Sequence, residues 1–232
     1  MTDHPPDLSA LLGRTFDGVL FDLDGTLIDS TPAVVRSWLA WAVEYGVDPL
    51  ALEGNHGVPA GQIVASVLPE PEVAAALARI IEIELADVEG IRGLPGAADA
   101  LLAAGTAGAI VTSCTRALAL ARLGATGLPV PAVLVTADDV RHGKPDPAPY
   151  LLGARLLGVD PATCLVVEDA PMGLIAGCRA GATTLAVTTT TPVAELVADA
   201  VVGDLGDVVL VRGPGGVTVT RPDRPDRPGN PA

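Results

Sequence analysis

The chain contains very little positive charge, and Lys144 is the only lysine among its 232 residues. Its formal net charge is −14 at pH 7. A nucleic-acid-binding surface needs a basic patch that neutralises phosphates, so we expect no nucleic-acid partner. An anionic substrate can bind such a chain only where positive charge is concentrated locally.

The chain also lacks long apolar runs and has few cysteines. No uninterrupted apolar stretch is long enough to span a bilayer, and residues 1–9 are polar and rich in proline, unlike a signal peptide. Cys114, Cys164 and Cys178 are an odd number without metal-site spacing, which suits reduced thiols. Only Arg116 lies near Cys114 in the sequence, so we expect no nucleophilic cysteine. These features favour a soluble cytoplasmic protein with no membrane partner.

Short β-rich apolar runs alternate with helix-like segments along the chain. This alternation predicts an α/β fold with a Rossmann-like doubly wound parallel sheet that helices cover on both faces. Ligands bind beyond the carboxyl ends of the strands in such sheets, and four of the five expected strands end in a polar residue. The expected strands are residues 19–22, 109–112, 133–136, 164–168 and 184–187.

A long helical detour follows the first expected strand. Ser30 or Thr31 can cap a helix that has Pro32 in its first turn, and two more helices are expected at about residues 60–68 and 72–88. An aromatic stripe at helical spacing in the first of these helices favours packing in a core over ligand binding. It consists of Trp38, Trp41 and Tyr45.

The domain boundaries follow from this detour. We expect a core domain of residues 14–29 and 93–212 and an inserted small α-helical cap domain of residues 30–92. Residues 208–220 alternate on both sides of a glycine turn and predict a β-hairpin, whereas residues 221–232 are rich in proline and charge and predict a disordered tail. Further helices are expected at residues 97–104, 116–123, 147–157, 171–179 and 192–198.

Two carboxylates, Asp22 and Asp24, stand one residue apart in "FDLDGT" at the end of the first expected strand. Such a pair repels unless a cation or a shared proton offsets the repulsion. Glu168 and Asp169, in "VVEDAP", end another expected strand. If the two strands are neighbours, these carboxylates meet around one hard divalent cation. Mg²⁺ is held in this way, with room left for water and a substrate phosphate.

Two further side chains are candidates for contacting a phosphate. Lys144 lies in a loop between two strands that form the crevice, where an ammonium stabilises a bound anion. Ser113 follows the strand at residues 109–112, and its hydroxyl can donate to a phosphoryl oxygen. Thr112 or Thr115 could supply this hydroxyl instead, and a hydroxyl at this place could also simply cap the next helix.

Four motifs, in this order and spacing, resemble the signature of the haloacid dehalogenase superfamily. The resemblance covers residues 16–202. The cap and the sequence "NHGVP" (residues 55–59) within it resemble the sugar phosphatase branch, which includes 2-deoxyglucose-6-phosphatases and glycerol phosphatases. The four motifs are "DLDGT" (residues 22–26), "IVTS" (110–113), "GKPDP" (143–147) and "VVEDAPMG" (166–173).

The resemblance implies a Mg²⁺-dependent phosphatase that hydrolyses small phosphate monoesters, such as sugar or polyol phosphates, through an aspartyl-phosphate. Asp22 would be the nucleophile, and Asp24 would protonate the leaving alcohol and then activate water. Mg²⁺ would be held by the Asp22 side chain, the Asp24 backbone carbonyl and the Asp169 side chain. Glu168 would act on the ion directly or through water.

The resemblance also implies a set of substrate contacts. Ser113 and Lys144 would hold the transferring phosphoryl group, and Thr26, His56 and Gly57 complete the expected substrate-binding residues. The His56 imidazole could bind a sugar hydroxyl, and an exposed loop histidine without a role is the alternative. Relatives often carry an arginine soon after the His-Gly pair, where this chain has Val58 and Pro59, so the particular sugar or polyol is left open.

Other activities can be weighed with the same residues. A dehalogenase does not need Asp24, and a phosphonatase needs a cap lysine, of which residues 30–92 contain none. A β-phosphoglucomutase-like sugar phosphomutase must bind a second phosphate under the cap, yet this segment has nine acidic residues against Arg36, Arg79 and Arg92. A non-catalytic binding or regulatory module is the other alternative, although no motif residue is missing. The sequence does not indicate the oligomeric state.

Overall fold

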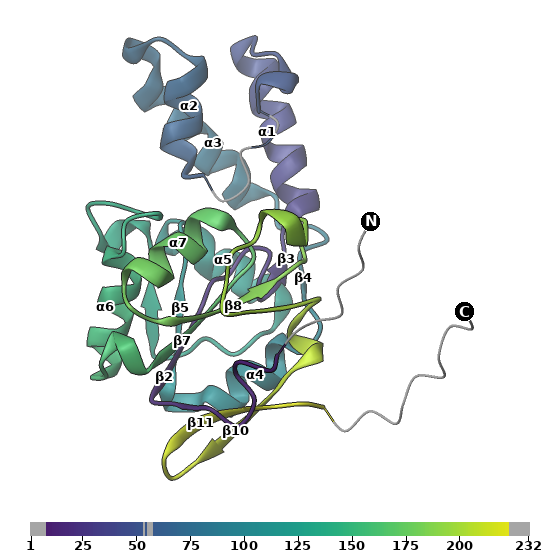
Figure 1. Ribbon diagram of the computed structural model, residues 1–232. Helices are drawn as coiled ribbons and strands as arrows, with labels where there is room; N and C mark the ends of the chain where they lie inside the picture. The colour runs from purple at the N-terminus through teal and green to yellow at the C-terminus, as the bar shows by residue number, and fades with distance from the viewer. Residues whose placement is uncertain (1–7, 53, 55–57, 223–232) are drawn as a thin grey trace.

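The computed structural model describes residues 8–52, 54 and 58–222. A parallel sheet of six strands lies at its centre, in the order β6-β5-β2-β7-β8-β9 (Figure 1). Helices cover both faces of this sheet, which confirms the predicted α/β fold. The strands are β2 (Gly18–Phe21), β5 (Gly108–Val111), β6 (Val133–Val135), β7 (Cys164–Glu168), β8 (Thr183–Val187) and β9 (Ala200–Val202).

Each face of the sheet has its own hydrophobic cluster. Successive side chains of a strand point to opposite faces. Val19 and Phe21 of β2 pack in the cluster that includes α4 and α5, whereas Leu20 packs in the cluster that includes α6 and α7. Hydrophobic packing on both faces of the sheet therefore fixes β2, the strand that precedes Asp22. The helices are α4 (Ala97–Ala104), α5 (Arg116–Thr126), α6 (Ala148–Leu157) and α7 (Pro171–Arg179).

The expected strand ends are correct to within one residue. β7 has the predicted bounds, whereas β2, β5 and β6 each stop one residue earlier than predicted. Asp22, Thr112 and Thr136 therefore begin the loops at the carboxyl edge of the sheet rather than ending the strands. Among the core helices, α4 and α7 have the predicted bounds, and α5 continues to Thr126.

The helix predicted at residues 192–198 is wrong. The structure has only a 3-10 turn, η5 (Val193–Glu195), and then an edge strand, β9, that the sequence analysis missed. The Asp199 carboxylate accepts hydrogen bonds from the backbone N–H (2.8 Å) and the hydroxyl (3.0 Å) of Thr184. These bonds fix the chain beside β8, so the segment is drawn into the sheet although its composition suits a helix.

Three helices occupy the segment that was expected to form the cap. They are α1 (Thr31–Tyr45), α2 (Ala60–Val67) and α3 (Glu70–Ala86), and they lie together above the sheet in Figure 1. They share a separate hydrophobic cluster around Trp41 and Ile80. The short strands β3 (Ile28–Asp29) and β4 (Arg92–Gly93) pair antiparallel, so the chain enters and leaves these helices side by side.

The aromatic stripe in α1 packs in the core of the cap, as predicted. Trp41 is fully buried, and its Nε1 donates to the Ala76 carbonyl at 2.9 Å. It stacks on Tyr45 and meets Trp38 edge-on, with ring centroids 4.9 and 5.3 Å away. Trp38 is only partly buried and also lines the cavity described below. Ser30 is the N-cap residue of α1, but its side chain makes no capping hydrogen bond.

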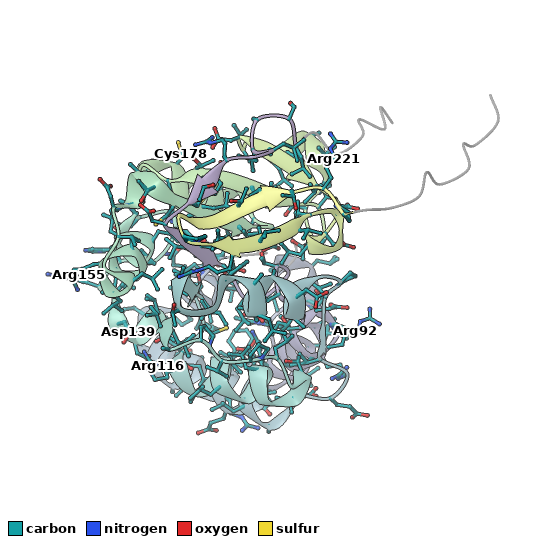
Figure 2. All side chains as sticks on the ribbon, turned by 90° about the horizontal axis from the view of Figure 1, so that it is seen from below. Arg92, Arg116, Asp139, Arg155, Cys178 and Arg221 are labelled. Carbon is teal, nitrogen blue, oxygen red and sulfur yellow. The ribbon has the colours of Figure 1, made fainter. Side chains whose placement is uncertain are left out.

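The predicted C-terminal hairpin is confirmed as β10 (Val209–Gly213) and β11 (Gly216–Thr220). The sequence analysis missed that β11 also pairs with β1 (Thr15–Phe16), which makes a three-stranded sheet. Figure 2 shows this sheet from below, on the side of the molecule opposite the cap. The predicted tail lies outside the described residues, apart from residues 221 and 222.

Two sequence-based expectations concern membranes and thiols. Among the residues that the structure describes, no helix combines the length and the apolar character needed to cross a membrane. All three cysteines are free: Cys164 is buried, Cys114 is half-buried, and Cys178 is exposed at the edge of the molecule (Figure 2).

We expect Ser37→Ala in α1 to stabilise the protein. The Ser37 hydroxyl is buried and has no hydrogen-bond partner among the described residues, so its removal should raise the free energy of unfolding by about 1 kcal/mol. Ser66→Ala in α2 is the matched control, because the exposed Ser66 hydroxyl already donates to the Ile63 carbonyl. Chemical denaturation of both variants is the measurement. A Ser37→Ala variant no more stable than Ser66→Ala would contradict the expectation.

Candidate active site

A cavity of about 710 Å³ lies between the cap helices and the carboxyl edge of the sheet. Its floor is formed by the loops after β2, β5 and β7, and its roof by α1, α2 and α3. The site predicted from the strand endings therefore exists as one concave space. The predicted residues that line it are Asp22, Asp24, Ser113, Lys144, Glu168 and Asp169.

Three carboxylates meet on the floor of this cavity. Oxygens of Asp22, Glu168 and Asp169 lie within 4.8 Å of one another, and each residue is less than a tenth exposed. The sheet brings them together because β2 and β7 are parallel neighbours with Phe21 paired to Val167. The condition for this meeting, that the two strands are neighbours, is therefore fulfilled.

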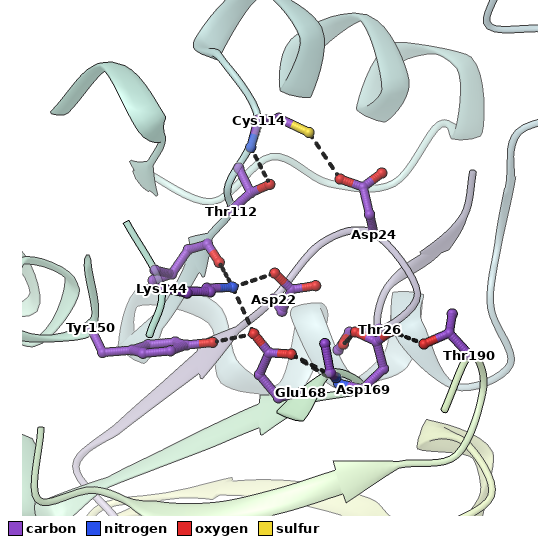
Figure 3. Close-up of polar contacts among 12 residues, drawn as sticks. Asp22, Asp24, Thr26, Thr112, Cys114, Lys144, Tyr150, Glu168, Asp169 and Thr190 are labelled. Atoms are coloured by element: carbon purple, nitrogen blue, oxygen red, sulfur yellow. Dashed lines mark hydrogen bonds and ion pairs between the residues drawn. The ribbon is translucent and has the colours of Figure 1, made fainter. Parts of the chain in front are cut away.

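Lys144 reaches into the carboxylate cluster from the loop before α6. Its Nζ is 2.5 Å from Asp22 Oδ1 and 2.7 Å from Glu168 Oε1, and it donates to the Val111 carbonyl at 3.0 Å (Figure 3). The Tyr150 hydroxyl donates to the same Glu168 oxygen at 2.9 Å. The single lysine of the chain is therefore buried against two carboxylates, at the place where the sequence analysis expected an anion.

Burial and mutual repulsion raise the proton affinity of the cluster. Burial, followed by the charge of Glu168, raises the pKa of Asp22 well above its ordinary value, although Lys144 opposes the shift. The same two causes raise the pKa of Asp169 from 3.8 to about 7. Burial alone would lower the pKa of Lys144, but Asp22 and Glu168 outweigh it and hold this pKa above its ordinary value. One ammonium does not balance three carboxylates, so a further cation would relieve the excess negative charge.

The oxygen donors fit a hard divalent cation such as Mg²⁺. Both oxygens of Glu168 already accept hydrogen bonds, Oε1 from Lys144 and Oε2 from two backbone N–H groups. Oδ1 of Asp22 accepts from Lys144, whereas no described residue donates to Oδ2. Asp22 Oδ2 is therefore the one oxygen of the three carboxylates to which no described residue donates, and Glu168 is placed to orient Lys144.

Threonine hydroxyls hold Asp169 in this position. Thr26 Oγ1 donates to Oδ1 at 3.1 Å, and Thr190 Oγ1 donates to Oδ2. Thr26 is 1% exposed, so the structure places this predicted substrate contact behind the carboxylates, where it supports Asp169. The sequence analysis missed Thr190, and the only available signal was the threonine run that follows β8. Gly25 is also required, because its φ is +86° and a Cβ atom there would collide with Asp169.

Asp24 points away from this cluster into a different environment. Its Oδ1 accepts from Ser30 Oγ at 2.6 Å and from Arg122 Nη1 at 2.7 Å. Its Oδ2 lies 3.0 Å from Cys114 Sγ. About a quarter of the Asp24 side chain is exposed. The sequence pair Asp22 and Asp24 is thus divided between two sets of partners, which removes most of the expected repulsion.

The hydroxyl after β5 is best supplied by Ser113. Thr112 Oγ1 accepts from the Cys114 backbone N–H at 3.1 Å, and Thr115 Oγ1 caps α5 by accepting from Leu118 N at 3.4 Å. Ser113 lines the cavity, and its hydroxyl has no partner among the described residues. It is therefore the hydroxyl that is free to meet a ligand.

Cys114 is held as a thiol. Burial, followed by the charge of Asp24, raises its pKa well above the ordinary value. The nearest cation is Arg122, 3.1 Å from Sγ, and not Arg116, which binds Asp139 (Figure 2). The expectation that Cys114 is not a nucleophile agrees with this geometry, although the arginine considered in the sequence was the wrong one.

The predicted cap residues cannot be placed in the same way. His56 and Gly57 lie outside the described residues, and both remain sequence-based predictions. Arg122 and Glu84 line the cavity and were missed entirely. Both lie within helices, where the sequence does not indicate which polar residue faces the cavity. The packing of α3 against α5 decides this.

Comparison with known proteins identifies the family. The model of the Haloacid dehalogenase-like hydrolase family matches residues 19–187, which is most of the chain. The chain is a haloacid dehalogenase-like hydrolase. The matched span begins in β2 and ends in β8, and it contains all four motifs of the sequence analysis.

Similar proteins include phosphatases. Hexitol phosphatase A of Escherichia coli (strain K12) is 43% identical to this hydrolase over 208 residues, which cover 86% of this chain and 96% of the relative. The 2-deoxyglucose-6-phosphate phosphatase 1 of Saccharomyces cerevisiae is 32% identical, with 84% and 91% covered. The crystal structure of CbbY from Rhodobacter sphaeroides in complex with phosphate has a TM-score of 0.72 at 24% identity, and the match covers 83% of this chain and 96% of CbbY. This last likeness shows the shared fold.

We expect the metal-free hydrolase to lose stability as the pH rises from about 4 to about 7. Asp169 keeps its proton up to a pKa of about 7 when folded but only to about 3.8 when unfolded, so the unfolded chain binds fewer protons in this window. Mg²⁺ should raise the melting temperature, and more so at pH 8 than at pH 5, because it binds the carboxylates. Thermal unfolding at several pH values, with EDTA or with Mg²⁺, is the measurement.

Asp169→Asn is the matched variant for this measurement, and Asp99→Asn, on the exposed face of α4, is the control. The first change should flatten the pH dependence and reduce the response to Mg²⁺, whereas the second should leave both unchanged. A melting temperature that does not respond to Mg²⁺ at pH 8 would count against a metal site at this cluster.

Proposed function

We propose that this hydrolase is a Mg²⁺-dependent phosphatase of sugar or polyol phosphates that works through an aspartyl-phosphate on Asp22. One observation carries the proposal. Asp22 lies on the cavity floor with one oxygen fixed by Lys144 and the other without a donor among the described residues, while Asp24 lines the same cavity with different partners. These are the positions needed by a nucleophile and by a separate acid and base.

In the first step, an oxygen of Asp22 attacks phosphorus and the bond from phosphorus to the substrate oxygen breaks. Asp24 donates its proton to the departing oxygen, so an alcohol leaves and an aspartyl-phosphate remains. Lys144 orients Asp22 and offsets the charge of the phosphoryl group, and the free Ser113 hydroxyl is placed to donate to a phosphoryl oxygen.

In the second step, Asp24 takes a proton from water as the water oxygen attacks the same phosphorus. The acyl-phosphate bond breaks, phosphate is released and the Asp22 carboxylate is regenerated. Asp22, Asp169 and the Asp24 backbone carbonyl would hold Mg²⁺, with Glu168 behind them. When bound, the ion supplies positive charge that lowers the repulsion between the carboxylates and the phosphoryl oxygens.

The cap supports a substrate with a single phosphate. The only charged side chain that the described part of the cap contributes to the cavity is Glu84, which repels a second phosphate. The names of the phosphatases similar to this chain refer to a hexitol and to 2-deoxyglucose 6-phosphate, which supports a sugar or polyol as the leaving group. The apolar lining includes Val34, Val35, Trp38, Leu39, Leu52, Val58, Ile63, Leu77 and Ile81.

A sugar phosphomutase is disfavoured by the charges of the cap. Each of the three cap arginines named in the sequence analysis already pairs with a carboxylate at 2.8 Å or less, so none is placed to bind a second phosphate. The pairs are Arg36 with Asp87, Arg79 with Glu44 and Arg92 with Asp29. Conversion of a sugar 1-phosphate into its 6-phosphate isomer, without release of phosphate, would support the mutase instead.

We expect the wild-type hydrolase to release phosphate from a panel of hexitol, hexose and glycerol phosphates only when Mg²⁺ is present. Asp22→Asn should lower kcat by about 10⁴-fold or more, because the nucleophile is lost, and Asp24→Asn by about 10²–10⁴-fold, because the acid and base is lost. Colorimetric measurement of released phosphate tests this, with circular dichroism to confirm folding. Asp99→Asn should keep full activity. Full turnover by Asp22→Asn would exclude the mechanism.

A further inference from the structure

We propose that Glu84 of the cap and Arg122 of the core act together as positioning residues that orient Asp24 for proton transfer. This inference rests on the proposed function, because it assigns Asp24 as the acid and base. Neither residue belongs to the motifs at the strand ends. Glu84 lies in the last turn of α3, and Arg122 lies in α5, so the pair joins the two parts of the molecule across the cavity.

Arg122 holds two carboxylates with one guanidinium group. Its Nη1 is 2.7 Å from Asp24 Oδ1, and its Nη2 is 3.0 Å from Glu84 Oε1. The planar fork of an arginine fixes the two contacts relative to each other, which a single ammonium cannot do. The guanidinium that binds Asp24, beside the Ser30 hydroxyl and the Cys114 thiol, is therefore itself held by a residue of the cap.

The arrangement is buried and costly to assemble. The side chains of Arg122 and Glu84 are 5% and 8% exposed. A buried ion pair adds little net stability because desolvation offsets the attraction, so stability alone does not account for this cluster. Glu84 is also the only acidic residue of the cap that the described structure buries. A role of the contact between Glu84 and Arg122 in orienting Asp24 would explain why Glu84 is buried.

The orientation of Asp24 matters most when the leaving group needs a proton. An alkyl phosphate releases a strongly basic alkoxide, so breaking its bond to phosphorus requires proton donation from Asp24. An aryl phosphate such as p-nitrophenyl phosphate releases a weakly basic phenolate, which departs without it. A residue that acts through Asp24 should therefore affect the first class of substrate selectively.

The test compares kcat/KM for glycerol phosphate, or for the best alkyl substrate of the panel, with that for p-nitrophenyl phosphate in the presence of Mg²⁺. Glu84→Ala should lower kcat/KM about tenfold for the alkyl phosphate and less than about twofold for the aryl phosphate. Glu84→Gln keeps an acceptor oxygen for Arg122 and should restore alkyl activity to within about threefold of wild type. Arg122→Lys keeps the charge but not the fork, and it should show the same selective loss as Glu84→Ala.

Glu82→Ala is the matched control, because Glu82 lies on α3 two residues away, is exposed and, among the residues that the structure describes, pairs with Arg79 alone. It should leave both rates unchanged. Equal losses on the two substrates, no loss in Glu84→Ala, or a Glu84→Gln variant as defective as Glu84→Ala would overturn the proposal. Melting temperatures of all variants identify any that fail to fold, and Arg122→Lys then remains as an independent variant.

A double-mutant cycle separates positioning from direct contact with the substrate. In an Asp24→Asn background, Glu84→Ala should cause no further loss of alkyl phosphate activity, because the residue on which it acts is already disabled. If Glu84 instead bound the polyol directly, the two losses would multiply, and the positioning role would be excluded. A wild-type protein that releases no phosphate from either substrate would contradict the proposed function itself, which is a different outcome from an active enzyme whose variants show no selectivity.

Discussion

The crowding of three buried carboxylates around one ammonium is the constraint on which the rest of the site depends. Parallel pairing of β2 with β7 brings Asp22 beside Glu168 and Asp169, and Lys144 alone offsets their charge. Because of this excess negative charge, the three carboxylates are unfavourable when all are ionised and no cation is bound. A hard cation would relieve their repulsion. Two threonine hydroxyls donate to Asp169 and Gly25 leaves room for its carboxylate, so the charge of the cluster is what a ligand must match.

The separation of Asp22 from Asp24 shows how neighbours in sequence acquire different chemistry. One carboxylate is nine-tenths buried and bound by Lys144, whereas the other is partly exposed and bound by Ser30 and Arg122. Different partners give the two carboxylates different surroundings, as separate roles in one reaction require. The contact between Glu84 of α3 and Arg122 of α5 connects the cap helices to Asp24, so these helices take part in this division.

The sequence predicted the sheet, the cap helices and the residues at the strand ends, because these depend on local periodicity and on short motifs. Asp22, Lys144 and Asp169 could be assigned to one site without coordinates. The sequence did not predict β9 or the pairing of β1 with β11, since both depend on contacts between distant segments. Thr190, Glu84 and Arg122 were missed for the same reason, as only tertiary packing decides which threonine or arginine faces the cavity.

The paired strands β3 and β4 give the two connections of the cap a shared axis. The antiparallel pairing of Ile28 with Gly93 joins the two connections between the cap and the core. A rotation of the cap about this pairing would move the distant parts of α1 and α2 far more than the end of α3. Glu84 lies only eight residues before Arg92 in the chain, near this pivot. If the cap turned about this pairing, Glu84 would therefore move less than the far end of α1.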